Sequence, residues 1–211
     1  GQRGFGDSSI AIFGEPGTGE FQFVLTGRHC TRRVDGDSVK GKAFGGPIFY
    51  GHAAESFYEG PEHKGNAYWY QAKRANAVYQ MLDGKQREAA LLSKSPGDNA
   101  AAIRLQKNTE SLTGLSVSDM TYDQVNEVKR VLEDLLMPFR KEDRTESMKL
   151  IEKAGFEDLH LSFYTDEDIA NDGVWDNWKL EGPHMVWYFR GNPHVHTWVH
   201  IADPDAPRDP R

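Results

Sequence analysis

Near the C-terminal end of the chain, histidine and tryptophan alternate with mainly apolar residues. Successive side chains of a β-strand point to opposite faces, so this pattern predicts a strand with two different faces. One face carries His194, His196, Trp198 and His200. The other face, suited to packing against a core, carries Val195, Thr197, Val199 and Ile201. Three of the eight histidines then line one face of one strand, a density that folding alone does not require.

His194 and His196 have the spacing by which one strand aims two imidazoles at one metal ion. Neutral imidazole is the commonest protein ligand for zinc, copper and iron. A third nitrogen from a neighbouring strand would leave one position open, as in a catalytic zinc or type-2 copper site. We prefer His29 as this third ligand, because it interrupts an apolar face of an expected strand. The alternatives are His184 and His200, followed by Glu62.

Two other interpretations of these histidines stay open. They can line a metal-free pocket for a small ligand, together with Trp198, His184 and His63. They can also be surface residues of an edge strand on which Trp198 packs. The five tryptophans of the chain favour a large aromatic core over a dedicated binding platform, since aromatic side chains bury the most area per residue.

The segment 59–66 (Glu-Gly-Pro-Glu-His-Lys-Gly-Asn) concentrates charged and imidazole side chains. Glu59 or Glu62 could act as a general base beside a metal-bound water, which would make the protein a hydrolase or lyase with zinc or copper as Lewis acid. The plain alternative is a solvated turn before a helix. A binding module that captures a metal or small ligand without turnover is the second functional hypothesis.

Composition narrows the choice of partners. The net charge of −7 argues against nonspecific binding to nucleic acid, which needs a basic face. The only cysteine, Cys30, excludes an intrachain disulfide and any paired-cysteine metal site. No apolar run reaches the length of a membrane-spanning helix.

Hydrophobic periodicity predicts an α+β fold with a mostly antiparallel sheet. The N- and C-terminal β segments are expected to meet in this sheet, with the helical middle packed on one face. Strands are expected at 8–13, 20–34, 159–164, 174–180, 184–189 and 194–202, with one more possible within 93–114. Helices are expected at 67–82, 84–92, 122–137 and 142–154, and a long packed loop at 41–66. Residues 8–203 would form one domain between a flexible lead-in (1–7) and a Pro/Asp-rich tail (204–211).

Three segments in this order resemble a bacterial family called domain of unknown function 3500. Thr26–Thr31 (Thr-Gly-Arg-His-Cys-Thr) is similar to a Gly-His-His-Leu-Ser/Thr element of that family. Met81–Ala90 is similar to a helix with the pattern Leu-x-x-x-Gln-Arg-x-x-Ala, and His194–Pro204 to a closing His-x-His strand that leads into Asp-Pro. The similarity runs from the first hairpin to Asp203.

The resemblance implies that His29, His194 and His196 occupy the positions that the family marks most strongly. At Arg28 the family more often has a second histidine, so a ligand role for that imidazole is absent here. Members are often exported with a twin-arginine-type leader, which implies a periplasmic or extracellular protein whose leader lies outside this chain, with a cytoplasmic location still open. The family brings no reaction that can be transferred.

Overall fold

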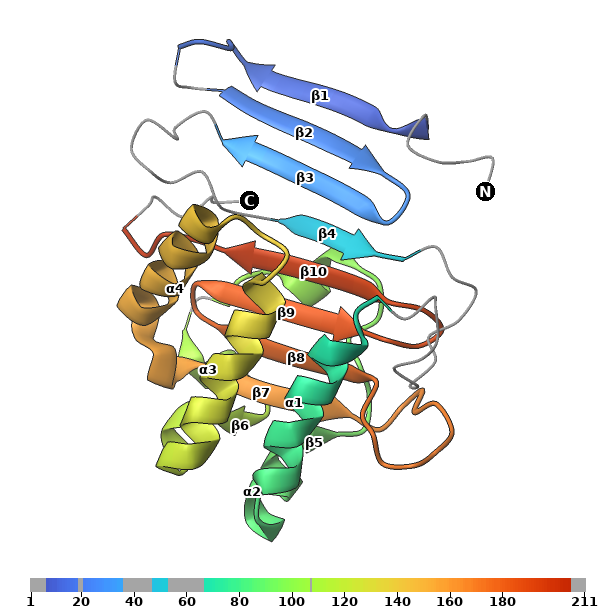
Figure 1. Ribbon diagram of the computed structural model, residues 1–211. Coiled ribbons are helices and arrows are strands. Elements are labelled where there is room, and N and C mark those ends of the chain that lie inside the picture. The colour runs from blue at the N-terminus through green and yellow to red at the C-terminus, as the bar shows by residue number, and fades with distance from the viewer. Residues whose placement is uncertain (1–6, 19–20, 36–46, 53–66, 107, 206–211) are drawn as a thin grey trace.

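The computed structural model describes residues 7–18, 21–35, 47–52, 67–106 and 108–205. Ten strands in these residues form one sheet, and four α-helices lie on one of its faces (Figure 1). The order along the sheet is β1-β2-β3-β4-β10-β9-β8-β7-β5, with β6 also paired to β7. All pairs are antiparallel except β5 with β7. The predicted α+β class and mostly antiparallel sheet are confirmed.

The first four strands pair in sequence order. They are β1 (Ser9–Gly14), β2 (Phe21–Gly27), β3 (Cys30–Asp35) and β4 (Ile48–Gly51). In Figure 1, β1 to β3 extend beyond the layer of helices. Several of their large apolar side chains are accordingly exposed, including those of Ile10 and Ile12.

The last four strands form a second antiparallel series. They are β7 (His160–Tyr164), β8 (Asn177–Gly182), β9 (Met185–Arg190) and β10 (His196–Ile201). The short strands β5 (Leu91–Leu92) and β6 (Leu115–Ser116) both pair with β7 on the side away from β8. The two series meet where β10 pairs with β4, with His196 opposite Gly51. The N- and C-terminal β segments therefore share one sheet, as the sequence predicts.

The α-helices are α1 (Trp69–Met81), α2 (Gly84–Ala90), α3 (Tyr122–Leu136) and α4 (Lys141–Gly155). Capping boxes begin two of them: Asp83 with Gln86 at α2 and Thr121 with Gln124 at α3. Gly155 has φ +98°, a conformation that glycine adopts at little cost at the end of a helix. Short 3₁₀ helices are η3 (Ala100–Ile103), η4 (Thr109–Ser111), η5 (Val117–Asp119) and η6 (Phe156–Asp158).

The two faces of the sheet are covered differently. On the helical face, Trp178 and Trp187 are fully buried within the main core, so the aromatic-core interpretation is confirmed for these two tryptophans. On the opposite face a smaller cluster forms around Tyr188 and Ala102, and Trp198 packs against it. Burial alternates along β10 as the sequence predicts, with Thr197, Val199 and Ile201 on the buried side.

Three expectations about the strands are wrong. The single strand expected at 20–34 is two strands, because Arg28 and His29 form a two-residue turn between Gly27 and Cys30. Part of the loop expected at 41–66 is β4, which finds partners in β3 and β10 that lie far away in sequence. The connection 93–114 has no strand in its described residues; η3 and η4 lie there instead.

Among the described residues, no helix combines the length and the apolar character needed to cross a bilayer.

Gly51 occupies the point where β4, β10 and the β2–β3 turn come together. A Cβ atom here would overlap the carbonyl oxygen of Val195 and would lie 3.2 Å from Cδ2 of His29. We therefore expect Gly51→Ala to lower the free energy of unfolding by about 1–3 kcal/mol, measured by denaturant titration. Gly84→Ala is the matched control, since nothing lies within 4 Å of its Cβ position. Equal stability of the two variants would contradict this close packing.

Candidate metal centre

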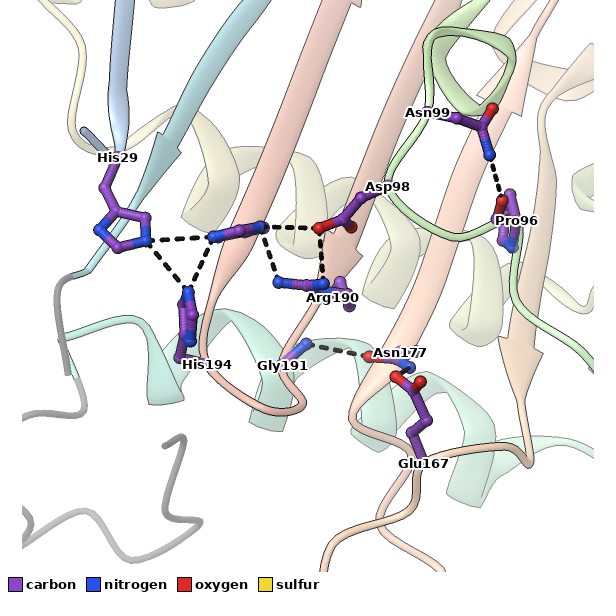
Figure 2. Close-up of polar contacts among 10 residues, drawn as sticks. His29, Pro96, Asp98, Asn99, Glu167, Asn177, Arg190, Gly191 and His194 are labelled. Atoms are coloured by element: carbon purple, nitrogen blue, oxygen red, sulfur yellow. Dashed lines mark hydrogen bonds and ion pairs between the residues drawn. The ribbon is translucent and has the colours of Figure 1, made fainter. Parts of the chain in front are cut away.

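Three histidines from separate parts of the chain converge beside the β4–β10 pair (Figure 2). His29 comes from the β2–β3 turn, His194 from the segment between β9 and β10, and His196 from the first position of β10. Two backbone hydrogen bonds hold these segments to β4. The N–H of Gly51 donates to the carbonyl of His29 (3.2 Å), and the N–H of His52 donates to the carbonyl of Val195 (3.4 Å).

The Nε2 atoms of the three rings form a nearly equilateral triangle. The separation is 3.1 Å from His29 to His194, 3.1 Å from His29 to His196 and 2.9 Å from His194 to His196. All three side chains are half-buried. Figure 2 shows the rings of His29 and His194 turned toward each other at these nitrogens.

Hydrogen bonds among the three rings cannot satisfy this triangle. An Nε2 atom carries either a hydrogen or a lone pair, and never both. With three atoms and two states, at least two atoms are in the same state. In at least one of the three contacts, therefore, both nitrogens carry a hydrogen or both carry a lone pair. Such a contact is repulsive at the N···N distances of 2.9–3.1 Å seen here.

A metal ion removes this conflict, because it takes the lone pairs of all three nitrogens. With Zn–N bonds of about 2.0–2.1 Å, Nε2 of His29, His194 and His196 are near enough to one another that they would hold one ion together. The three nitrogens thus fit a metal ion and leave one side of it without a protein ligand from this group.

The Nδ1 atom of His196 contacts two further residues on the side away from the triangle. Nη2 of Arg190 lies 2.7 Å from it and Oδ2 of Asp98 lies 3.1 Å from it. Arg190 and Asp98 also form an ion pair of 2.6 Å (Figure 2). Arg190 lies directly opposite His196 in the β9–β10 ladder. Asp98 comes from the connection between β5 and η3.

Aromatic rings pack beside the imidazole of His196. The ring of Phe49 lies 5.2 Å from that of His196 and the ring of Trp198 lies 5.6 Å from it, both edge-on. Trp198 in turn stacks on Tyr188 at 5.3 Å. These apolar neighbours restrict the rotation of the imidazole and keep water away from one side of it.

A family model described as "Protein of unknown function (DUF3500)" matches residues 5–205 of this sequence. The chain belongs to this family. The resemblance seen in the three sequence segments is thereby confirmed, and it now covers nearly the whole chain. No curated protein and no solved structure matches.

In this DUF3500 protein the structure brings together His29, His194 and His196, and it leaves His200 and His184 outside this group. His200 lies on the same face of β10, next to the backbone of Ile103, and is not a member of the group. His184 lies in the β8–β9 turn at the opposite end of β10, where its carbonyl accepts a hydrogen bond from Ala202. Trp198 lies next to His196 and stacks on Tyr188. Glu59, Glu62 and His63 lie outside the described residues.

Sequence reasoning missed Asp98, Arg190 and Gly51 as parts of this DUF3500 centre. Arg190 carries a usable signal: in a hairpin from β9 to β10, the residue that pairs with His196 must share its face. No sequence pattern indicates Asp98, because this residue lies in the irregular connection between β5 and η3. That connection is held in place when the N–H and Oγ of Ser95 both donate to the carboxylate of Asp166, at 2.9–3.0 Å.

The environment keeps these imidazoles neutral. Burial, reinforced by His196 and His194, lowers the pKa of His29 to about 4. Burial and the nearby Arg190 guanidinium lower the pKa of His196 to about 4, and the same two causes lower the pKa of His194. Near pH 7 the three rings are therefore uncharged and offer lone pairs, which metal binding requires.

The pKa values of the folded protein predict how its metal-free form responds to acid. Folding lowers the pKa of His29 and His196 from 6.5 to about 4, so the unfolded chain binds protons more readily between these values. Stability should therefore fall as the pH decreases from about 6.5 to about 4. Thermal melts in the presence of a chelator measure this. In the double variant His29→Asn/His196→Asn the slope should be reduced, and an unchanged slope would contradict the assignment.

His29 adopts φ +56°, a left-handed conformation that asparagine tolerates better than histidine. Relief of this strain in His29→Asn should raise the free energy of unfolding of the metal-free protein by up to about 1 kcal/mol. His200→Asn, at a regular strand position, is the matched control and should bring no such gain. Loss of stability in His29→Asn would show that ring packing outweighs the backbone strain.

Proposed function

We propose that this protein binds one zinc or copper ion through Nε2 of His29, His194 and His196. The observation that carries the proposal is the triangle of ring nitrogens at 2.9–3.1 Å, which mutual hydrogen bonds leave repulsive and a cation satisfies. The neutrality of the rings supports it further, because protons do not compete strongly for these nitrogens near pH 7.

The donor set favours zinc or copper. Within the described residues the group consists of imidazoles alone, with no cysteine, aspartate or glutamate among its members. Imidazole suits zinc and copper(II), whereas magnesium and calcium prefer oxygen ligands and copper(I) prefers sulfur. Cys30 follows His29 directly in the chain but is not a member of the group.

Three protein ligands leave a position for water or a small ligand, the arrangement of catalytic rather than structural zinc sites. A hydrolase or lyase needs a base on that open side, and Glu62 and Glu59 are our candidates from the sequence. Asp98, by contrast, contacts the Nδ1 side of His196 and orients a ligand instead of facing the open position. Capture of a metal or small ligand without turnover is the alternative function, and it requires only the described residues.

The location that we propose, outside the cytoplasm, rests on the resemblance alone and stays a prediction.

Metal analysis tests this proposal directly. The protein, purified without a chelating tag, should contain or take up about one equivalent of zinc or copper per chain, measured by elemental analysis and calorimetric titration. The double variant His194→Ala/His196→Ala should lose this metal and still fold, because Val199 and Ile201 on the opposite face of β10 provide the packing. His200→Ala is the matched control on the same strand and should keep the metal. Metal retained by the double variant, or absent from the wild type after loading with each ion, would contradict the proposal.

A further inference from the structure

The Nδ1 atom of His196 contacts two groups that require opposite hydrogen-bonding states of this atom. Nη2 of Arg190 is 2.7 Å away and Oδ2 of Asp98 is 3.1 Å away. A guanidinium only donates hydrogen bonds and a carboxylate only accepts them. The neutral imidazole therefore satisfies Arg190 when Nδ1 carries a lone pair, and satisfies Asp98 when Nδ1 carries a hydrogen.

This choice at Nδ1 fixes the state of the opposite ring nitrogen. When Nδ1 accepts from Arg190, Nε2 carries the hydrogen and has no lone pair for a metal. When Nδ1 donates to Asp98, Nε2 has its lone pair free and faces His29 and His194. One tautomer of His196 is thus competent to bind a metal, and Asp98 is the partner that favours it.

We propose that Asp98 is a positioning residue that sets the metal-binding tautomer of His196, and that Arg190 opposes it by favouring the other tautomer. This inference rests on the proposed metal-binding function, and it adds which residues control the metal affinity of the site. Carboxylates that hold a ligating histidine in this way increase metal affinity by fixing the ring and making it more basic.

The surroundings of the two residues fit these roles. Arg190 is placed by the β9–β10 ladder directly opposite His196, and only 13% of its side chain is exposed. Asp98 is held from outside the ladder, in a segment fixed by the contact of Ser95 with Asp166 and followed by the cap of η3 at Asn99. Among the described residues, Nδ1 of His29 is buried without a hydrogen-bond partner. Nδ1 of His196, in contrast, contacts both Arg190 and Asp98, so neighbouring side chains can select its tautomer.

A purely structural role for the Asp98–Arg190 pair makes a different prediction. If the pair only fastened the connection to the sheet, removal of either member would break the same ion pair, and both variants would weaken metal binding alike. Tautomer selection predicts opposite effects instead. Loss of Asp98 removes the group that favours the binding tautomer, and loss of Arg190 removes both its competitor and a positive charge near the ion.

The experiment compares Asp98→Asn and Arg190→Met with the wild type by Zn²⁺ titration against a chromophoric chelator at one fixed pH. Asp98→Asn should weaken zinc binding about 10–100-fold. Arg190→Met should bind zinc as tightly as the wild type or more tightly, and Asp98→Glu should bind more tightly than Asp98→Asn. Unchanged affinity in Asp98→Asn, or equal weakening in Asp98→Asn and Arg190→Met, would overturn the inference.

Nitrogen-15 NMR of the histidine rings gives a readout that does not depend on how well the variants fold. In the metal-free wild type, Nδ1 of His196 should carry the hydrogen because it donates to Asp98, and a hydrogen on Nε2 instead would overturn the inference. The two proposals fail in distinguishable ways. A wild type that binds no zinc contradicts the metal site itself, whereas a wild type that binds zinc with the wrong order of variants contradicts only the role of Asp98 and Arg190.

Discussion

A ring nitrogen of imidazole carries either one hydrogen or one lone pair, and this constraint determines what the group of His29, His194 and His196 can bind. Three such atoms at 2.9–3.1 Å cannot all be partners of one another. A triangle of this kind is stable only when a cation satisfies the three nitrogens together or when the fold forces the rings into contact. The backbone constrains the rings here. His29 is held at φ +56°, and backbone hydrogen bonds tie its turn and the residue after His194 to β4. Strain of this kind is typical of functional sites.

The pairing of β4 with β10 makes this geometry possible. Through it, a turn from the N-terminal half of the sheet meets a segment near the C-terminal end, so histidines more than 160 residues apart reach one point. Gly51 belongs to this junction because its missing side chain leaves space for the backbone at Val195 and the ring of His29. The helices contribute indirectly. They bury the opposite face of β10 and so leave His196 and Trp198 on the face that carries the centre.

The sequence predicts much of this arrangement where the pattern is local. Alternation from His196 to Ile201 correctly indicates a two-faced strand, and the helix expected at 122–137 begins where α3 (Tyr122–Leu136) begins. His29 was selected for a reason that the structure corrects: it lies in a turn and not on an apolar strand face, because Gly27 pairs with Cys30. Likewise His194 precedes β10 by two residues. Strand β4 and the approach of Asp98 depend on contacts between distant segments, which no local periodicity encodes.

The central claim is that one ion is bound by three imidazole nitrogens at this junction. The most direct measurement is a crystal structure of the zinc-loaded protein with anomalous difference maps recorded on either side of the zinc absorption edge. The account predicts a single strong peak about 2.0–2.1 Å from Nε2 of His29, His194 and His196. A peak elsewhere in the molecule, or no peak beside these three rings at full zinc loading, would contradict it.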